Sequence, residues 1–506
     1  MNPGSDAAIP AARAVPLTAI TLIAGLLLGC ATADEPGNVA ATSGTIPDSS
    51  GRERLARPSE RDKKGYTFPV LSAGVALFHT LVSKPAARPL SSLHRLVSFV
   101  TSTTFDTLDP DSVVLTGRAP VPPLSQGRGM DLAAWEERLD ELTGRAPSKG
   151  TIRFLVDGDE FFPRLVDAVE GAERSVDIRI YIFDNDDYAT AFADRLKRRS
   201  EDVKIRVLVD GLGTLIAAGA TPESTPPGAV GAGWIADYLE RDSDVDVRVQ
   251  SNPWLTGDHT KTIVVDNEVA FVGGMNIGRE YRYDWHDLMM EVRGPVVGDI
   301  DHGFRLAWRR AGFLGEFGYL AESLWSSVGR EAGTGYAVRM LVTKPWNSEI
   351  FRTQLAAIRN AERYIYIQNP YFSDDKILIA LIEARRRGVD VRVILPFRGD
   401  NKIMDGSNVV VANTLFQQGV RVFIYPGFSH VKAAIFDGWA CLGSANLDKM
   451  SLRVNEEMNL ATSHPPTVAA LMAQVFDVDF AKSAEMTEPL PQNLGHRLAA
   501  LIANQL

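Results

Sequence analysis

The chain carries the same short motif twice, and this repeat limits its possible folds more than any other feature. Each copy places Lys two residues after His, Asp five residues after that Lys, and a Gly-x-x-Asn segment beyond. The copies comprise His259, Lys261, Asp266 and Asn276, and then His430, Lys432, Asp437 and Asn446. Side chains two apart on a strand share a face, so each His and Lys should enter one site. Apolar residues between each Lys and Asp indicate buried strands.

The repeat extends beyond the motifs. Ala172-Glu173-Arg174, which leads into the strand-like segment 178–182, has a counterpart in Ala361-Glu362-Arg363, which leads into 364–367, at an offset of about 189 positions. The strand-like segment 205–209 has a counterpart at 391–395, at an offset of about 186. A near-constant offset indicates an internal duplication. β-branched runs between helical stretches predict an α/β fold with buried sheets. We therefore expect two similar α/β domains, at 141–330 and 331–506.

The motif offset is only about 171 positions, so the first half must contain additional residues. The Gly-, Pro- and Ala-rich stretch 211–233 is the candidate. Its composition predicts a long loop over one face of the domain. This loop is either an insertion without function or a gate over the site.

The motif residue types suit cleavage of a phosphodiester. A neutral imidazole can attack phosphorus, and a second, protonated imidazole can give its proton to the departing oxygen. The lysines and the neutral asparagine donors can hold phosphate oxygens as charge develops. The pattern therefore predicts transfer or hydrolysis through a phosphohistidine. With two cysteines and no Cys/His cluster of zinc-site spacing, we expect neither metal nor cofactor.

At these motifs the chain resembles the phospholipase D superfamily, and within it the bacterial cardiolipin synthases. The likeness covers about 150–480 and is carried by further segments as well. These are Tyr181-Ile182-Phe183, Asp287, Gly294-Pro295, Pro370-Tyr371-Phe372, Ser451-Leu452-Arg453 and Asn459. The resemblance implies that two domains face each other across a pseudo-twofold axis. It also implies one shared site that hydrolyses or transfers phosphatidyl groups of phospholipids.

The resemblance further implies individual roles. His259 is expected to be the nucleophile and His430 the general acid and base, although the symmetry of the motifs leaves the reverse assignment open. Asp287 and Glu457 are expected to orient the imidazoles, whereas Asp266 and Asp437 brace the fold. Ser444 lies in the second Gly-Ser-x-Asn segment, but Gly274 replaces the usual Ser in the first. The second motif is also one residue shorter between its Asp and its Gly, which predicts a tighter hairpin.

The N-terminus resembles an address signal. An apolar run over 17–28 ends in Leu27-Leu28-Gly29-Cys30, which resembles the lipobox of bacterial lipoproteins, although an uncleaved anchor or an ordinary secretory signal are alternatives. We expect 1–30 to be a signal peptide with lipidation at Cys30, 31–65 a flexible linker, and 66–140 an extension of unknown role. The mature protein would then lie on a membrane surface facing the periplasm, with the outer membrane possible.

These observations favour a phosphatidyltransferase that acts on membrane phospholipids as a monomer, because both motifs lie in one chain. Hydrolysis to phosphatidic acid is the first alternative, and a non-catalytic membrane-surface scaffold on the same fold is a second. A secreted nuclease is disfavoured, because the formal net charge of -10 argues against nucleic acid as a partner.

Overall fold

The computed structural model describes residues 121–125, 127–217, 221–250, 257–312, 315, 333–344, 347–396 and 398–503. The predicted signal peptide with Cys30, the linker 31–65 and the first part of the 66–140 extension lie outside these residues. Among the helices in the described ranges, none is both long and apolar enough to cross a bilayer.

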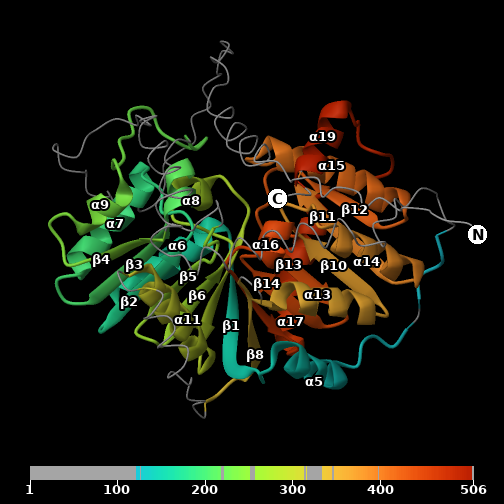
Figure 1. Ribbon diagram of the computed structural model, residues 1–506, viewed down its shortest axis with the longest axis horizontal. Coiled ribbons are helices and arrows are strands. Elements are labelled where there is room, and N and C mark those ends of the chain that lie inside the picture. The colour runs from blue at the N-terminus through green and yellow to red at the C-terminus, as the bar shows by residue number, and fades with distance from the viewer. Residues whose placement is uncertain are drawn as a thin grey trace, which may run out of the picture. The chain divides into compact units, whose positions relative to one another are not determined.

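Within the described residues the strands form one mixed sheet of sixteen strands with helices packed on it (Figure 1). The strands of the first half are β1 (Ser148–Val156), β2 (Ser175–Ile180), β3 (Lys204–Asp210), β4 (Asp246–Gln250), β5 (Thr262–Val265), β6 (Val269–Gly273) and β7 (Leu288–Arg293). Those of the second half are β8 (Tyr336–Lys344), β9 (Asn347–Ser348), β10 (Tyr364–Gln368), β11 (Asp390–Pro396), β12 (Arg421–Tyr425), β13 (Ala433–Phe436), β14 (Trp439–Gly443), β15 (Glu457–Thr462) and β16 (Ala484–Glu485).

The strand order of the first half recurs in the second. Outward from the centre, the first half runs β1-β7-β6-β5-β2-β3-β4, and the second runs β8-β15-β14-β13-β10-β11-β12-β16. The two series join where β1 pairs with β8 in antiparallel fashion, with Ser148 opposite Val338. The predicted α/β class is confirmed, and the predicted strand segments lie in β2, β3, β10 and β11. The twofold relation between the halves stays a prediction.

The helices belong to the same two halves. The first described helix, α5 (Leu132–Thr143), precedes β1. The first half then contains α6 (Asp157–Glu170), α7 (Asp187–Arg199), α8 (Gly211–Ala217), α9 (Ile235–Glu240), α10 (Arg279–Tyr283) and α11 (Val296–Ala311). The second half contains α13 (Glu349–Asn360), α14 (Asp375–Arg386), α15 (Lys402–Gln417), α16 (Lys449–Arg453), α17 (Pro465–Leu471), the π-helical turn η4 (Met472–Phe476), α18 (Asp477–Lys482) and α19 (Leu494–Ala503).

Three apolar layers hold these elements together. One lies between α6, α7, α9 and the first-half strands, and includes Phe162 and Ile178. A second lies between α13, α14, α15 and the second-half strands, and includes Ile358. The third joins both halves, because Val264 of β5 and Ile435 of β13 belong to one buried cluster. The central strands are therefore covered on both faces, which explains their continuous apolar sequences.

The two motif hairpins differ as predicted. Three residues, Asp266–Glu268, connect β5 and β6, because Val265 pairs with Val269. Two residues connect β13 and β14, because Phe436 pairs with Trp439. These two, Asp437 and Gly438, have positive φ values of 47° and 98°, as a tight two-residue hairpin turn requires. The expectation of a tighter second hairpin is confirmed.

Two segments show what the sequence did not indicate. The stretch 211–233 does not begin as a loop, because α8 occupies Gly211–Ala217. The carboxylate of Asp210 accepts hydrogen bonds from the first N–H groups of this helix, at 3.0 Å from Leu212 and 2.9 Å from Gly213. The glycines of the stretch had suggested a loop, and for these seven residues that prediction is wrong.

The described part of the 66–140 extension packs on the second half. Trp135 of α5 meets Trp439 of β14 edge to face, with ring centroids 5.3 Å apart, and the backbone N–H of Met130 donates to Asp437 at 2.9 Å. Arg385 of α14 donates to the carbonyl of Pro122 at 2.7 Å. This part of the chain therefore forms a strap across the second half.

Candidate active site

The two motifs meet because each begins beside a segment from the other half. Asp258 forms a parallel bridge with Glu456, and the N–H of His259 donates to the carbonyl of Glu456 at 2.9 Å. His286 bridges in the same way with Ser429, and the N–H of His430 donates to the carbonyl of His286 at 2.7 Å. Each histidine therefore lies just before its motif strand, beside the segment of the other half that carries the acidic residue.

Each imidazole is held by a carboxylate from the opposite half. His259 Nδ1 lies 2.9 Å and 3.1 Å from the two carboxylate oxygens of Glu457. His430 Nδ1 lies 2.7 Å from Asp287 Oδ2. A carboxylate at Nδ1 favours the tautomer that has its proton there, which leaves Nε2 unprotonated and able to act as nucleophile or base. The four side chains are thus two crossed pairs.

The motif lysines lie in the same buried site. Lys261 Nζ donates to the carbonyl of His259 at 2.8 Å, and Lys432 Nζ donates to the carbonyl of His430 at 2.7 Å. Burial lowers the pKa of Lys261 to about 7 and that of Lys432 to about 8. Two ammonium groups in one dry site repel each other, so an anion between them would stabilise both.

Burial also sets the charge state of the imidazoles. It lowers the pKa of His259 well below the usual value, and the charges of Lys261 and Lys432 add to this effect. The pKa of His430 is lowered in the same way by burial and by both lysines. Burial raises the pKa of Asp287 to about 7 and that of Glu457 to about 8. Burial and the lysines therefore favour the neutral form of both imidazoles.

The motif asparagines are buried beside these groups. Asn276 Oδ1 accepts the N–H of Ile182 at 3.0 Å, which fixes the orientation of its amide. Asn446 is only 5% exposed, and its Oδ1 has no hydrogen-bond partner in the described part of the chain. Both side chains are therefore buried, and the second has capacity for a further polar contact.

The motif aspartates lie at the far ends of the motif strands. Asp266 accepts backbone N–H groups from Glu173, Arg174 and Ser175 at 2.7–2.9 Å. Asp437 accepts those of residues 362–364 at 2.6–3.2 Å. Both carboxylates thus tie a motif hairpin to the start of the neighbouring strand, β2 or β10, rather than facing the histidines.

The carboxylates of the two crossed pairs have different second partners. Ser444 Oγ donates to Glu457 Oε2 at 2.6 Å. Asp287 instead accepts the N–H of Leu288 at 2.7 Å through Oδ1. A Cβ added at Gly274 would lie 2.2 Å from Asp287 Oδ1, so a side chain there would collide with the carboxylate. The replacement of Ser by Gly in the first motif is therefore matched to the position of Asp287.

Aromatic rings surround the imidazoles. The ring of Tyr181 meets that of His259 with centroids 4.7 Å apart, and Lys261 Nζ lies 5.0 Å from the same tyrosine ring. Trp285 and Phe428 lie 5.2 Å and 5.6 Å from the ring of His430. These rings exclude water from the site, which strengthens every charge interaction within it.

Sequence reasoning missed the polar residues behind the histidines. Arg179 of β2 contacts Asp258 and Glu456, which precede His259 and Glu457. His286 lies between two carboxylates, at 2.7 Å from Asp157 and 2.8 Å from Asp479. The available signal for Arg179 was a charged residue inside a strand in which every residue after Ser175 is buried. For His286 no spacing in the sequence indicated its distant partners.

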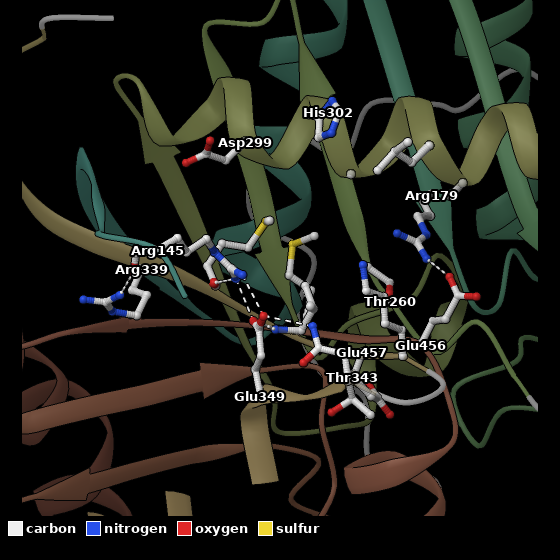
Figure 2. A pocket seen from close by; sticks show the side chains of 18 of the residues that line it. Arg145, Arg179, Thr260, Asp299, His302, Arg339, Thr343, Glu349, Glu456 and Glu457 are labelled. Carbon is white, nitrogen blue, oxygen red and sulfur yellow. Dashed lines mark hydrogen bonds and ion pairs between the residues drawn. The ribbon is translucent and has the colours of Figure 1, made fainter. Parts of the chain in front are cut away.

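A cavity of about 370 Å³ lies behind the first motif, between α11 and strands of both halves (Figure 2). Thr260, Glu456, Arg179 and Arg145 line it, whereas the two motif lysines and His430 do not. Glu457 also lines it, so the cavity reaches the first crossed pair from behind. The described residues contain no group of three or more metal-ligating side chains that could hold an ion.

Comparison with known proteins agrees with this geometry. The family model described as cardiolipin synthase, phospholipase D-like domain, matches residues 165–308 and 355–480, just over half of the chain. The chain is 30% identical over 394 residues to cardiolipin synthase A of Pseudomonas fluorescens, covering 71% of this chain and 76% of that protein. It is 31% identical over 382 residues to cardiolipin synthase A of Pseudomonas entomophila, with the same two shares.

A solved structure gives the same fold. The crystal structure of phosphatidylserine synthase from Haemophilus influenzae superposes with a TM-score of 0.58 at 12% identity, covering 73% of this chain and all of that one. At this identity the likeness concerns the fold alone. Together with the family match, it shows the class: a protein of the phospholipase D fold that carries the His-x-Lys-x4-Asp motif twice. The chain belongs to the cardiolipin synthase family of phospholipase D-like proteins.

Proposed function

We propose that the chain is a phosphatidyltransferase, which moves the phosphatidyl group of a membrane phospholipid to an alcohol through a phosphohistidine on His259. The observation that carries this proposal is the crossed pairing of His259 with Glu457 and of His430 with Asp287. It supplies two imidazoles of fixed tautomer with two buried lysines, which is what displacement at phosphorus requires. The relatives named cardiolipin synthase support the same substrate class.

In the first step, His259 Nε2 attacks phosphorus as the bond to the departing alcohol oxygen breaks. His430 Nε2–H gives its proton to that oxygen, so the alcohol leaves neutral. In the second step, the acceptor alcohol gives its proton to His430 as its oxygen attacks phosphorus, and the bond to His259 breaks. Lys261 and Lys432 stabilise the charge that grows on the phosphate oxygens.

This scheme needs a proton on His430, whereas burial and the two lysines lower the pKa of that imidazole. A phosphodiester anion adds a negative charge between the imidazoles. That charge raises the pKa of His430. We therefore expect substrate binding to be accompanied by proton uptake.

The reaction is tested with vesicles of phosphatidylglycerol and purified full-length chain. Transfer predicts cardiolipin and glycerol as products, and both should disappear in His259→Ala and in His430→Ala. Phosphatidic acid without cardiolipin would replace transfer by hydrolysis. Absence of any turnover by the wild type, under conditions in which it binds the vesicles, would contradict an enzymatic function and support a scaffold.

We further propose that the chain acts as a monomer on a membrane of the cell envelope, held by acylation of Cys30 and facing the periplasm. Both motifs lie in one chain, which supports the monomer. The test is vesicle flotation and labelling with a radioactive fatty acid for the wild type and Cys30→Ser. Label in both proteins, or activity that sediments only with dimers, would contradict this arrangement.

A further inference from the structure

One buried guanidinium contacts both chain segments that carry the first crossed pair. Arg179 Nε donates to Asp258 Oδ2 at 2.8 Å, and its Nη2 donates to Glu456 Oε2 at 2.6 Å. Asp258 immediately precedes His259, and Glu456 immediately precedes Glu457. All three side chains are at most 8% exposed. The distance between the His259 imidazole and the Glu457 carboxylate therefore depends on Arg179, which contacts the residues before them.

The surroundings keep these charges balanced. Arg310 of α11 forms an ion pair with Glu456 from the other side, and the N–H of Asp258 donates to Asp210 at 2.9 Å. Figure 2 shows Arg179 pointing at the carboxylate of Glu456 along the wall of the cavity. Two guanidinium groups thus face the two carboxylates of Asp258 and Glu456. Loss of Arg179 alone would leave a buried negative charge uncompensated next to His259.

On these contacts, and on the proposed role of His259, we propose that Arg179 is a positioning residue. It fixes the spacing of the His259–Glu457 pair and cancels the charge of Asp258 beside the imidazole. This goes beyond the motif residues, because the side-chain partners of Arg179 are Asp258 and Glu456.

The charge effect has a definite direction. Burial is the main cause of the low pKa of His259, the two lysines lower it further, and Asp258 raises it. With Arg179 removed, the effect of Asp258 is no longer offset, so the pKa of His259 rises. The charged and titratable groups that face His259 come from both halves. They are Lys261, Asp258, Asp210 and Tyr181 of the first half, and Glu457, Lys432 and His430 of the second.

The experiment compares Arg179→Gln and Arg179→Lys with a matched control, Arg206→Gln. Arg206 of β3 forms an equivalent pair with Asp177 of β2 at 2.6 Å and 2.8 Å, and its guanidinium lies over the rings of Phe304 and Trp308 rather than beside Asp258 and Glu456. The readouts are the pH profile of kcat/KM, and the NMR titration of the His259 imidazole, assigned by its absence in His259→Gln.

We expect Arg179→Gln to shift the acid limb of kcat/KM and the His259 titration upward by about one pH unit, and to lower kcat about 100-fold. Arg179→Lys should keep the pH profile and lose only part of kcat. Adding Asp258→Asn and Glu456→Gln to Arg179→Gln should return the acid limb toward its wild-type position. Arg206→Gln should lower the melting temperature without moving either pH readout.

An unshifted His259 titration in folded Arg179→Gln would overturn the inference, as would an equal shift in Arg206→Gln. Failure of the proposed function is separately visible. A wild type that makes neither cardiolipin nor phosphatidic acid removes the reaction, whereas the His259 titration still reports whether Arg179 sets the charge environment of that imidazole.

Discussion

The regions behind the two histidines have the same strand pairing but differ in the charge of their side chains. Arg179 occupies the position in β2 that Gln368 occupies in β10, because each lies opposite the residue that follows its motif lysine. Arg179 binds two carboxylates, whereas Gln368 Nε2 donates to the neutral hydroxyl of Ser429 at 2.8 Å. The two halves therefore share the strand position of this hydrogen-bond donor but differ in its charge.

The two halves also differ in charge at the residue that precedes each orienting acid. Glu456, beside Glu457, is matched by His286, beside Asp287. Burial opposes protonation of His286, but hydrogen bonds to Asp157 and Asp479 raise its pKa to about 9. One cation between two carboxylates leaves a net negative charge behind His430, while the cluster behind His259 is balanced. Neither of these two carboxylates is among the groups that shift the pKa of His430, so the choice of His259 as nucleophile and His430 as proton carrier stays a proposal.

The largest expected effect comes from removing the charge of either orienting carboxylate. Glu457→Gln and Asp287→Asn should each lower kcat about 10³- to 10⁴-fold on phosphatidylglycerol, because an amide can stabilise the unreactive tautomer. A substrate with a p-nitrophenol leaving group does not need a proton from His430. With this substrate, the burst of p-nitrophenol released in the first step should be restored in Asp287→Asn and stay absent in Glu457→Gln. Recovery in both variants would contradict the division of roles.

The second expected effect concerns the contribution of His286, which lies behind His430, to the free energy of unfolding. The pKa of His286 is raised in the folded state, so its contribution is complete below about pH 6.5 and is lost as the pH rises through about 9. The total is on the order of 3 kcal/mol. Urea unfolding of the wild type between pH 6 and pH 10 should show this decline, and His286→Gln should flatten it. His464→Gln, whose imidazole stacks on Tyr336, is the matched control.

The third expected effect distinguishes the surroundings of Asp287 from those of Glu457. Gly274→Ala should lower kcat about 100-fold, because the new Cβ would displace Asp287. Ser444→Ala should cost only about tenfold, since Glu457 loses one hydrogen bond but keeps its place. The double variant Gly274→Ser with Asp287→Glu reproduces the second half's arrangement in the first. It should be more active than Gly274→Ala, and a lower activity would show that the two sides are not interchangeable.

The smallest expected effect is confined to the hairpins. Gly438→Ala places a side chain at a φ of 98° and should lower the free energy of unfolding by about 1 kcal/mol. Asn267→Ala, in the three-residue turn, has a φ of 55° and should cost less. Thermal unfolding measures both, and kcat should stay unchanged, because these turns lie at the strand ends far from the histidines.

Much of this arrangement could be predicted from the sequence, because it depends on local patterns. The His and Lys of each motif, the apolar strands and the shorter second hairpin all follow from spacing within about ten residues. The site's supports could not be predicted in this way. Arg179 reaches Glu456 across 277 positions and His286 reaches Asp479 across 193, and only the assembled sheet brings them together. Helix α8 was missed because its capping carboxylate, Asp210, precedes a glycine-rich stretch.

The crossed pairing limits how the two halves of such a chain can be exchanged between relatives. Neither half contains a complete dyad, since His259 depends on Glu457 and His430 on Asp287. A hybrid that joins one half to a relative's other half must therefore bring a compatible acid with each histidine, or both imidazoles lose their orientation together. Under the proposed mechanism, any displacement of one half from the other would part both imidazoles from their carboxylates at once, so reactivity would be confined to the closed arrangement.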